Sequence, residues 1–142
     1  MRLDAADALA RLTAHDHAVL STLHPVRGVD AVPVAYAVHD GAVGVPVDLV
    51  KPKASTRLQR ERNLEADGRA TLLAEQWHRT DWSQLWWARA ELEWEPDASA
   101  EQVAALAAAL EAKYPQYEGQ PFVRVLVLRI VGMSGWAAAA DT

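Results

Sequence analysis

The chain has 142 residues, of which 51% are hydrophobic, and this suits one globular domain over residues 1–142. It has no cysteine, which excludes disulfide frameworks, thiolate metal sites and cysteine nucleophiles. The net charge of -5 argues against general binding of nucleic acid. The N-terminus has no apolar leader, and no apolar run approaches the roughly 20 residues of a membrane helix. We therefore expect a soluble, cytoplasmic protein with no membrane partner.

The first predicted elements are a short helix and a strand. The segment LDAADALARL (3–12) has an apolar side and a capping residue, Asp4, so it predicts a helix. HAVLSTL (17–23) is rich in β-formers and predicts a strand. Between them, HDH (15–17) matches no standard zinc spacing, so it predicts a turn and no metal site.

A hairpin is predicted next, over DAVPVAYAVHDGAVGVPVD (30–48). Its centre is Asp40-Gly41, a strong signal for a two-residue turn. Bulky side chains alternate along it with alanine, glycine and proline, so one face carries small side chains. Such a face could let a flat ligand approach the backbone, or it could pack against a neighbouring strand or subunit.

The second half of the chain predicts two more helices and three more strands. Thr56 and Gln59 fit a capping box for a helix that runs to about Ala66, and Ser99 and Gln102 fit one for a helix to about Tyr114. The strands are predicted over 69–77, 85–94 and 122–136, and the second has a core face of Trp86, Ala88, Ala90, Leu92 and Trp94. Six strands, mostly joined by short turns, predict a mainly β fold: an antiparallel barrel with peripheral helices.

The six tryptophans are many for a chain of this length, and four of them lie within positions 77–87. Trp77 and Trp82 flank a polar loop, where a large ring is costly unless it contacts something. They predict either a dimer interface, in which aromatic residues are enriched, or an aromatic wall for a planar ligand. Both interpretations hold if the ligand lies between subunits.

KPKASTRLQRER (51–62) gathers five of the chain's 14 cations: Lys51, Lys53, Arg57, Arg60 and Arg62. A solvated helix face is the usual reason for such a run. The alternative is an anion site, because the cations surround a predicted helix N-terminus, where free backbone N–H groups favour negative charge. Ser55 and Thr56 add hydroxyl donors at the same point. The stretch lacks the glycine-rich pattern of a nucleotide-hydrolysing P-loop.

Four segments carry a family resemblance: VLSTLHPVRGVDAVPVAYAV, VDLVKPKASTRLQRERNLEADGRATLLAEQW, DWSQLWWARAELEW and YPQYEGQPFVRVLVLRIVGMSGW. Together they cover nearly the whole chain. The chain resembles the split β-barrel flavin and deazaflavin proteins related to pyridoxamine 5′-phosphate oxidase. Within them it is most similar to the coenzyme F420-dependent oxidoreductases.

The resemblance implies a six-stranded split barrel of the FMN-binding type, assembled as a homodimer with cofactor sites at the subunit interface. It implies hydride transfer between coenzyme F420 and a small-molecule substrate, with the chemistry carried by the cofactor. This agrees with the sequence, in which no hydrolytic triad or pair of catalytic carboxylates can be assembled. FMN is the alternative cofactor, and a non-catalytic flavin- or deazaflavin-binding protein is the alternative function.

The resemblance also places the cofactor on the chain, with its ring against the hairpin and its phosphate against the basic segment. For the ring we expect contacts from Pro33, Val34 and Val47, and from Trp77 or Trp82. For the phosphate we expect Lys53, Ser55, Thr56 and Arg57. Lys51 and Arg60 are expected further out, where the acidic tail of F420 could reach them.

Overall fold

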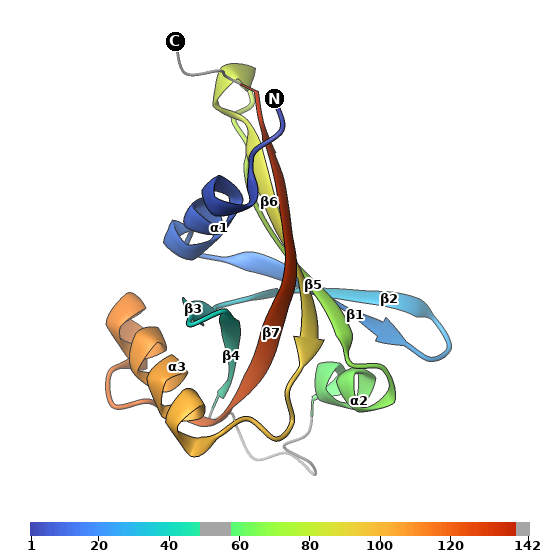
Figure 1. The fold of residues 1–142 in the computed structure, drawn as a ribbon, viewed down its shortest axis with the longest axis vertical. Helices are drawn as coiled ribbons and strands as arrows, with labels where there is room; N and C mark the ends of the chain where they lie inside the picture. The colour runs from blue at the N-terminus through green and yellow to red at the C-terminus, as the bar shows by residue number, and fades with distance from the viewer. Residues whose placement is uncertain (49–57, 139–142) are drawn as a thin grey trace.

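The alternating segments become strands of one antiparallel sheet, with helices around it (Figure 1). The structure is a computed structural model that describes residues 1–48 and 58–138. Its elements, in chain order, are α1 (Ala5–Ala14), β1 (Ala18–His24), β2 (Gly28–Val34), β3 (Ala37–His39), β4 (Ala42–Asp48), α2 (Gln59–Ala66), β5 (Arg69–Gln76), η1 (Trp82–Gln84), β6 (Trp86–Trp94), α3 (Ala100–Lys113), η2 (Pro115–Tyr117) and β7 (Phe122–Ala137).

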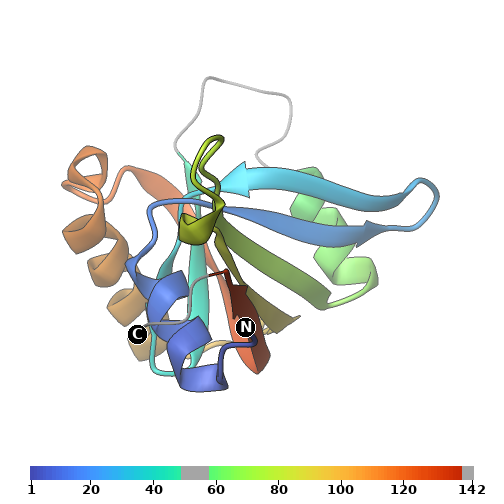
Figure 2. The same cartoon turned by 90° about the horizontal axis from the view of Figure 1, so that it is seen from above.

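The sheet has the strand order β2-β1-β5-β6-β7-β4-β3, and all neighbours are antiparallel. It curls strongly, as the view from above shows (Figure 2). The described residues therefore form seven strands, so the predicted count of six is wrong by one. In this order β2 and β3 are edge strands, and the sheet is an open one with peripheral helices.

The extra strand arises because the first arm of the predicted hairpin is broken at Ala35 and Tyr36. Before the break, β2 pairs with β1; after it, β3 pairs with β4 around the predicted Asp40-Gly41 turn. At the break, the backbone N–H of Tyr36 donates to the hydroxyl of Tyr114 (3.2 Å), and its own hydroxyl donates to the carbonyl of Leu12. Side chains thus satisfy groups that the sheet ladder leaves free.

Two hydrophobic clusters lie on opposite sides of β4. The main core collects the inward residues of the strands with Leu12 of α1 and Leu64 of α2. The second lies under α3, whose Leu106 and Leu110 are fully buried against β3, β4 and β7. Gly44 of β4 faces this helix, so part of the small-residue face of the hairpin is covered within the subunit.

The helix starts are confirmed for two of the three helices. Asp4 and Ser99 accept hydrogen bonds from the backbone N–H groups of Asp7 and Gln102, as expected for N-caps. α2 differs, because it begins at Gln59, with the backbone N–H of Leu58 donating to Glu61 (3.2 Å). The predicted cap Thr56 lies outside the described residues. Among the described helices, none is long and apolar enough to span a membrane.

Candidate functional site

A small cavity of about 240 Å³ lies where β2 meets the start of α2. Ala31 and Val32 of β2 form one wall, and Leu58, Gln59 and Arg60 form the other. Thr22, Arg27 and Asp30 complete the lining. The cavity therefore joins the predicted ring-binding strand to the end of the basic segment, two parts of the chain that the resemblance assigns to one cofactor.

A buried amide holds these two walls together. Asn63 of α2 is fully buried, and its Nδ2 donates to the hydroxyl of Thr22 (2.9 Å) and to the carboxylate of Asp30 (2.8 Å). Its Oδ1 accepts a hydrogen bond from Gln59 (3.0 Å). Because β1, β2 and α2 each contribute a partner, Asn63 fixes the first turn of α2 against the two strands.

The acidic side of the cavity is neutralised within it. The guanidinium of Arg27 binds the carboxylate of Asp30 through two hydrogen bonds, of 2.7 and 2.9 Å. These bonds, together with the one from Asn63, lower the pKa of Asp30 below its ordinary value. Asp30 is thus an ionised structural carboxylate and is unsuited to proton transfer near neutral pH.

Arg60, unlike Asp30, has a charged side chain with an unsatisfied hydrogen-bonding atom among the described residues. Its Nε is buried and, within the described part of the chain, has no hydrogen-bond acceptor. Burial lowers the pKa of its guanidinium, although the carboxylates of Glu61 and Asp48 oppose that shift. A buried donor without an acceptor is costly, so this arginine suits an anion that supplies one. Among the predicted cofactor residues that the structure describes, it is the one that lines the cavity.

The predicted ring contacts on the hairpin differ in exposure. Pro33 is exposed on the edge strand β2, one residue beyond the cavity wall. The side chains of Val34 and Val47 are buried in the main core, so only their backbone atoms could face a ligand. The predicted phosphate and tail residues Lys51, Lys53, Ser55, Thr56 and Arg57 lie outside the described residues.

Trp77 and Trp82 lie at the far end of the molecule from α2. They flank the connection between β5 and β6, shown at the top of Figure 1, whereas α2 lies near the bottom. Their rings are 5.9 Å apart between centroids, and each residue is 63% exposed. Within one subunit the structure therefore does not bring these rings to the cavity. Trp86 and Trp94 pack against the main core as predicted.

Sequence reasoning missed Asn63, Asp30 and Arg27, because their roles depend on contacts between segments far apart in the chain. The sequence offered one signal: Asn63, whose side chain is an amide, stands directly before the apolar Leu64 on the predicted helix. Polar residues on an otherwise apolar helix side are buried only when partners satisfy them. The identity of those partners, Thr22 and Asp30, could not be deduced before β1 and β2 were placed beside α2.

Comparison with known proteins identifies the fold. The sequence matches no protein-family model and no curated protein. Among solved structures, a FAD-binding protein from Mesorhizobium loti matches with a TM-score of 0.69 and 17% identity, over 95% of this chain and 93% of the other. The FAD-binding protein from Mycobacterium smegmatis matches with a TM-score of 0.61 and 14% identity, over 96% and 97%.

A third structure is described as a candidate pyridoxamine 5′-phosphate oxidase, from Corynebacterium glutamicum. Its TM-score is 0.57 and its identity 15%, over 95% of this chain and 94% of the other. These chains match almost end to end, at identities that show the fold alone. The chain therefore shares the mainly β, antiparallel fold of these three structures, with helices around the sheet.

Proposed function

We propose that the chain is one subunit of a homodimeric, cytoplasmic oxidoreductase of the pyridoxamine 5′-phosphate oxidase-like class. Its cofactor would be coenzyme F420, with FMN as the alternative, and its substrate a small organic molecule. When bound, the cofactor supplies a ring that accepts or donates hydride. The fold it shares with two FAD-binding proteins supports a flavin-type cofactor.

The observation that carries the proposal is Arg60, which lines the cavity between β2 and α2 and whose buried Nε has no hydrogen-bond acceptor among the described residues. Five cations are spread over 51–62, and in the described part of this segment the Nε of Arg60 is buried without an acceptor. An anionic cofactor group would supply that acceptor. The residues of this chain that would hold the cofactor are Arg60, the basic segment before it and the exposed edge of β2.

The homodimer completes the proposed site. A cavity of about 240 Å³ is smaller than the 300–1,000 Å³ that is usual for a small-molecule site. A second subunit would add walls to it, and the exposed rings of Trp77 and Trp82 are candidates because they lie far from the cavity of their own chain. In this proposal, the rings of Trp77 and Trp82 of each subunit contact the cofactor that is bound by the other subunit.

The deciding experiment compares the two proposed cofactors, F420 and FMN, on the purified protein, and includes FAD because two of the matching structures are FAD-binding proteins. F420, FMN and FAD are titrated separately, and binding is followed by quenching of tryptophan emission. We expect F420 to bind most tightly, and removal of its glutamate tail to weaken it, because outer cations meet that tail. If FMN binds more tightly and tail length has no effect, FMN is the cofactor. If none of the three binds at micromolar concentration, the proposal is wrong.

Two lysine variants test the proposed anion site at 51–62, and each is the control for the other. Lys53→Ala should weaken F420 binding about 10- to 100-fold at low and high salt, because a charge-assisted contact to phosphate contributes roughly 1.5–3 kcal/mol. Lys51→Ala should weaken F420 binding only mildly, and this effect should diminish at high salt, as expected for a screened outer contact. Equal, small effects would make the segment a solvated helix face. If the protein binds F420 but transfers hydride to none of a set of small organic substrates tested with it, the non-catalytic alternative is favoured.

A further inference from the structure

A second and larger cavity, of about 580 Å³, lies on the other side of α2. It is open to solvent and is lined by Glu61 of α2, the end of β6, the loop into α3, the first turns of α3 and the beginning of β7. Its volume falls within the range of sites for small organic ligands. The two cavities share no lining residue among those that the structure describes: Gln59 and Arg60 line the cavity between β2 and α2, and Glu61 lines this one.

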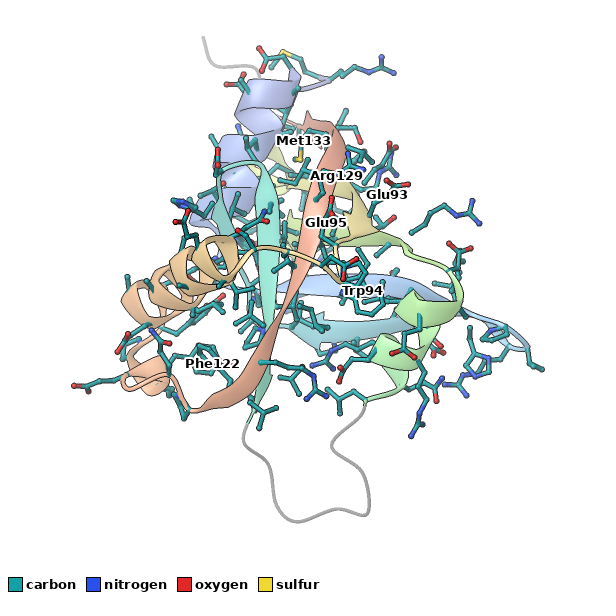
Figure 3. All side chains as sticks on the ribbon, turned by 60° about the horizontal axis from the view of Figure 1, so that its bottom comes forward. Glu93, Trp94, Glu95, Phe122, Arg129 and Met133 are labelled. Carbon is teal, nitrogen blue, oxygen red and sulfur yellow. The ribbon has the colours of Figure 1, made fainter. Side chains whose placement is uncertain are left out.

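The charges on its wall are paired. At its base, Nε and Nη2 of Arg124 donate to the two carboxylate oxygens of Glu61, each at 2.7 Å. The side chain of Glu61 is only 6% exposed, and this bidentate contact raises the pKa of Arg124. At the rim, Glu95 accepts a hydrogen bond from Arg129, which also binds Glu93; Figure 3 shows these three side chains together beside β7.

The rest of the wall is apolar and includes one aromatic ring, with Trp94, Pro96, Ala98, Val103, Val125 and Val127 contributing. Trp94 packs against the main core, which holds its ring in place. The loop is also fixed, because the N–H of Glu95 donates to the carbonyl of Val127 (2.8 Å) and the N–H of Ala98 to that of Glu95 (3.2 Å). The cavity is therefore preformed.

We propose that this cavity binds an uncharged ring compound, separately from the cofactor site. The ring lies against Trp94, where an aromatic face favours offset or edge contacts with another ring. A ligand with a net charge is disfavoured, because the described charges of the wall are already engaged, Glu61 with Arg124 and Glu95 with Arg129, and a new charge would compete with these pairs.

The test uses 2-naphthol, which is uncharged near neutral pH, and 2-naphthoate, which has the same rings and a negative charge. Binding is followed by the indole N–H resonance of Trp94 in a nitrogen-15 correlation spectrum. We expect 2-naphthol to shift this resonance with a dissociation constant below about 1 mM, and 2-naphthoate to bind at least about 10-fold more weakly. Equal binding of the two would overturn the charge argument and with it the proposal.

Two matched variants locate the site. Val103→Trp fills the cavity from α3 and should weaken 2-naphthol binding at least about 10-fold. Val123→Trp makes the same change at a β7 position that is 42% exposed and does not line the cavity, so it should bind like the wild type. The proposal is overturned if Val103→Trp binds as well as Val123→Trp, or if 2-naphthol leaves the Trp94 resonance unshifted up to its solubility limit.

Discussion

At the scale of single residues, Asn63 connects the most distant parts of the candidate site. Its amide is fully buried and satisfies Thr22 and Asp30, 41 and 33 positions away in the sequence. Removing it would leave two polar groups without their buried partner, and unsatisfied buried groups cost about 1–3 kcal/mol each. The same change would free the first turn of α2 from β1 and β2.

We therefore expect Asn63→Ala to lower the free energy of unfolding by about 2–3 kcal/mol, measured by urea denaturation. The matched control is Arg62→Ala, the neighbouring exposed position of the same helix, which should stay within about 0.5 kcal/mol of the wild type. Similar stabilities for the two variants would show that the amide network does not hold α2 in place.

Lys113 gives a second residue-scale prediction, on pH. Its Nζ is buried and lies 3.8 Å from the centroid of the Tyr36 ring. It has no hydrogen-bond acceptor among the described residues. Burial lowers the pKa of Lys113 from 10.5 to about 8, while the charge of Asp16 acts in the opposite direction. Between pH 8 and 10.5 the unfolded chain therefore binds more protons than the folded one, so stability from this group rises with pH.

The measurement compares the unfolding free energy of the wild type and Lys113→Met from pH 7 to pH 10.5. Their difference should be constant below about pH 8 and then shift in favour of the wild type as pH rises, because the buried ammonium becomes a neutral amine. Tyrosines that titrate at high pH are present in both proteins, so they leave the difference unchanged. Parallel curves across the whole range would contradict the burial of a charged Lys113.

At the scale of elements, the contact of α3 with β4 depends on a glycine. A Cβ at Gly44 would lie 2.9 Å from the Cβ of Leu106, closer than real side chains approach. Gly44→Ala should therefore push α3 from the sheet and destabilise the protein by about 1–3 kcal/mol in thermal unfolding. Gly68→Ala is the control, because its nearest contact would be 3.8 Å, and it should be neutral or stabilising by up to about 1 kcal/mol.

The elements that sequence predicts well are those with local signals. The Asp40-Gly41 turn, the Ser99 cap and the alternation of β6 all depend on neighbouring residues, and all are confirmed. The break between β2 and β3 was missed because the alternation of bulky and small residues continues through Tyr36. At the break, the backbone N–H of Tyr36 is satisfied by the hydroxyl of Tyr114, which is 78 positions away in the sequence.

The candidate site was predicted in part for the same reason. The basic segment and the resemblance led us to expect Arg60 further out, beside the tail of F420, whereas in the structure it lines the cavity at β2. The burial of Val34 and Val47 could not be deduced from alternation, because a hairpin pattern defines two faces without saying which one meets the core. The distance between the Trp77–Trp82 pair and α2 likewise depends on how the whole sheet curls.

At the scale of the whole molecule, one sheet face remains without a covering helix among the described residues. Pro33, Val19 and Leu73 lie side by side across β2, β1 and β5, and Val29 lies opposite Leu23. None of them belongs to the two clusters into which the helices bury their leucines, and Val29 is 62% exposed. Ser21 and Thr71 lie between these apolar rows, so the face is mixed, and we expect a second copy to pack on it.

We expect light scattering at micromolar protein to give twice the subunit mass of 15.5 kDa. Val29→Glu should raise the dimer dissociation constant at least about 10-fold, because two-fold symmetry would bury two unpaired carboxylates per dimer. Val26→Glu is the matched control: Val26 lies in the turn between β1 and β2, is 89% exposed, and should leave the mass unchanged. A dimeric Val29→Glu would move the interface to another face. A monomeric wild type would remove the partner on which the proposed cofactor site depends, since Trp77 and Trp82 reach that site only from a second subunit.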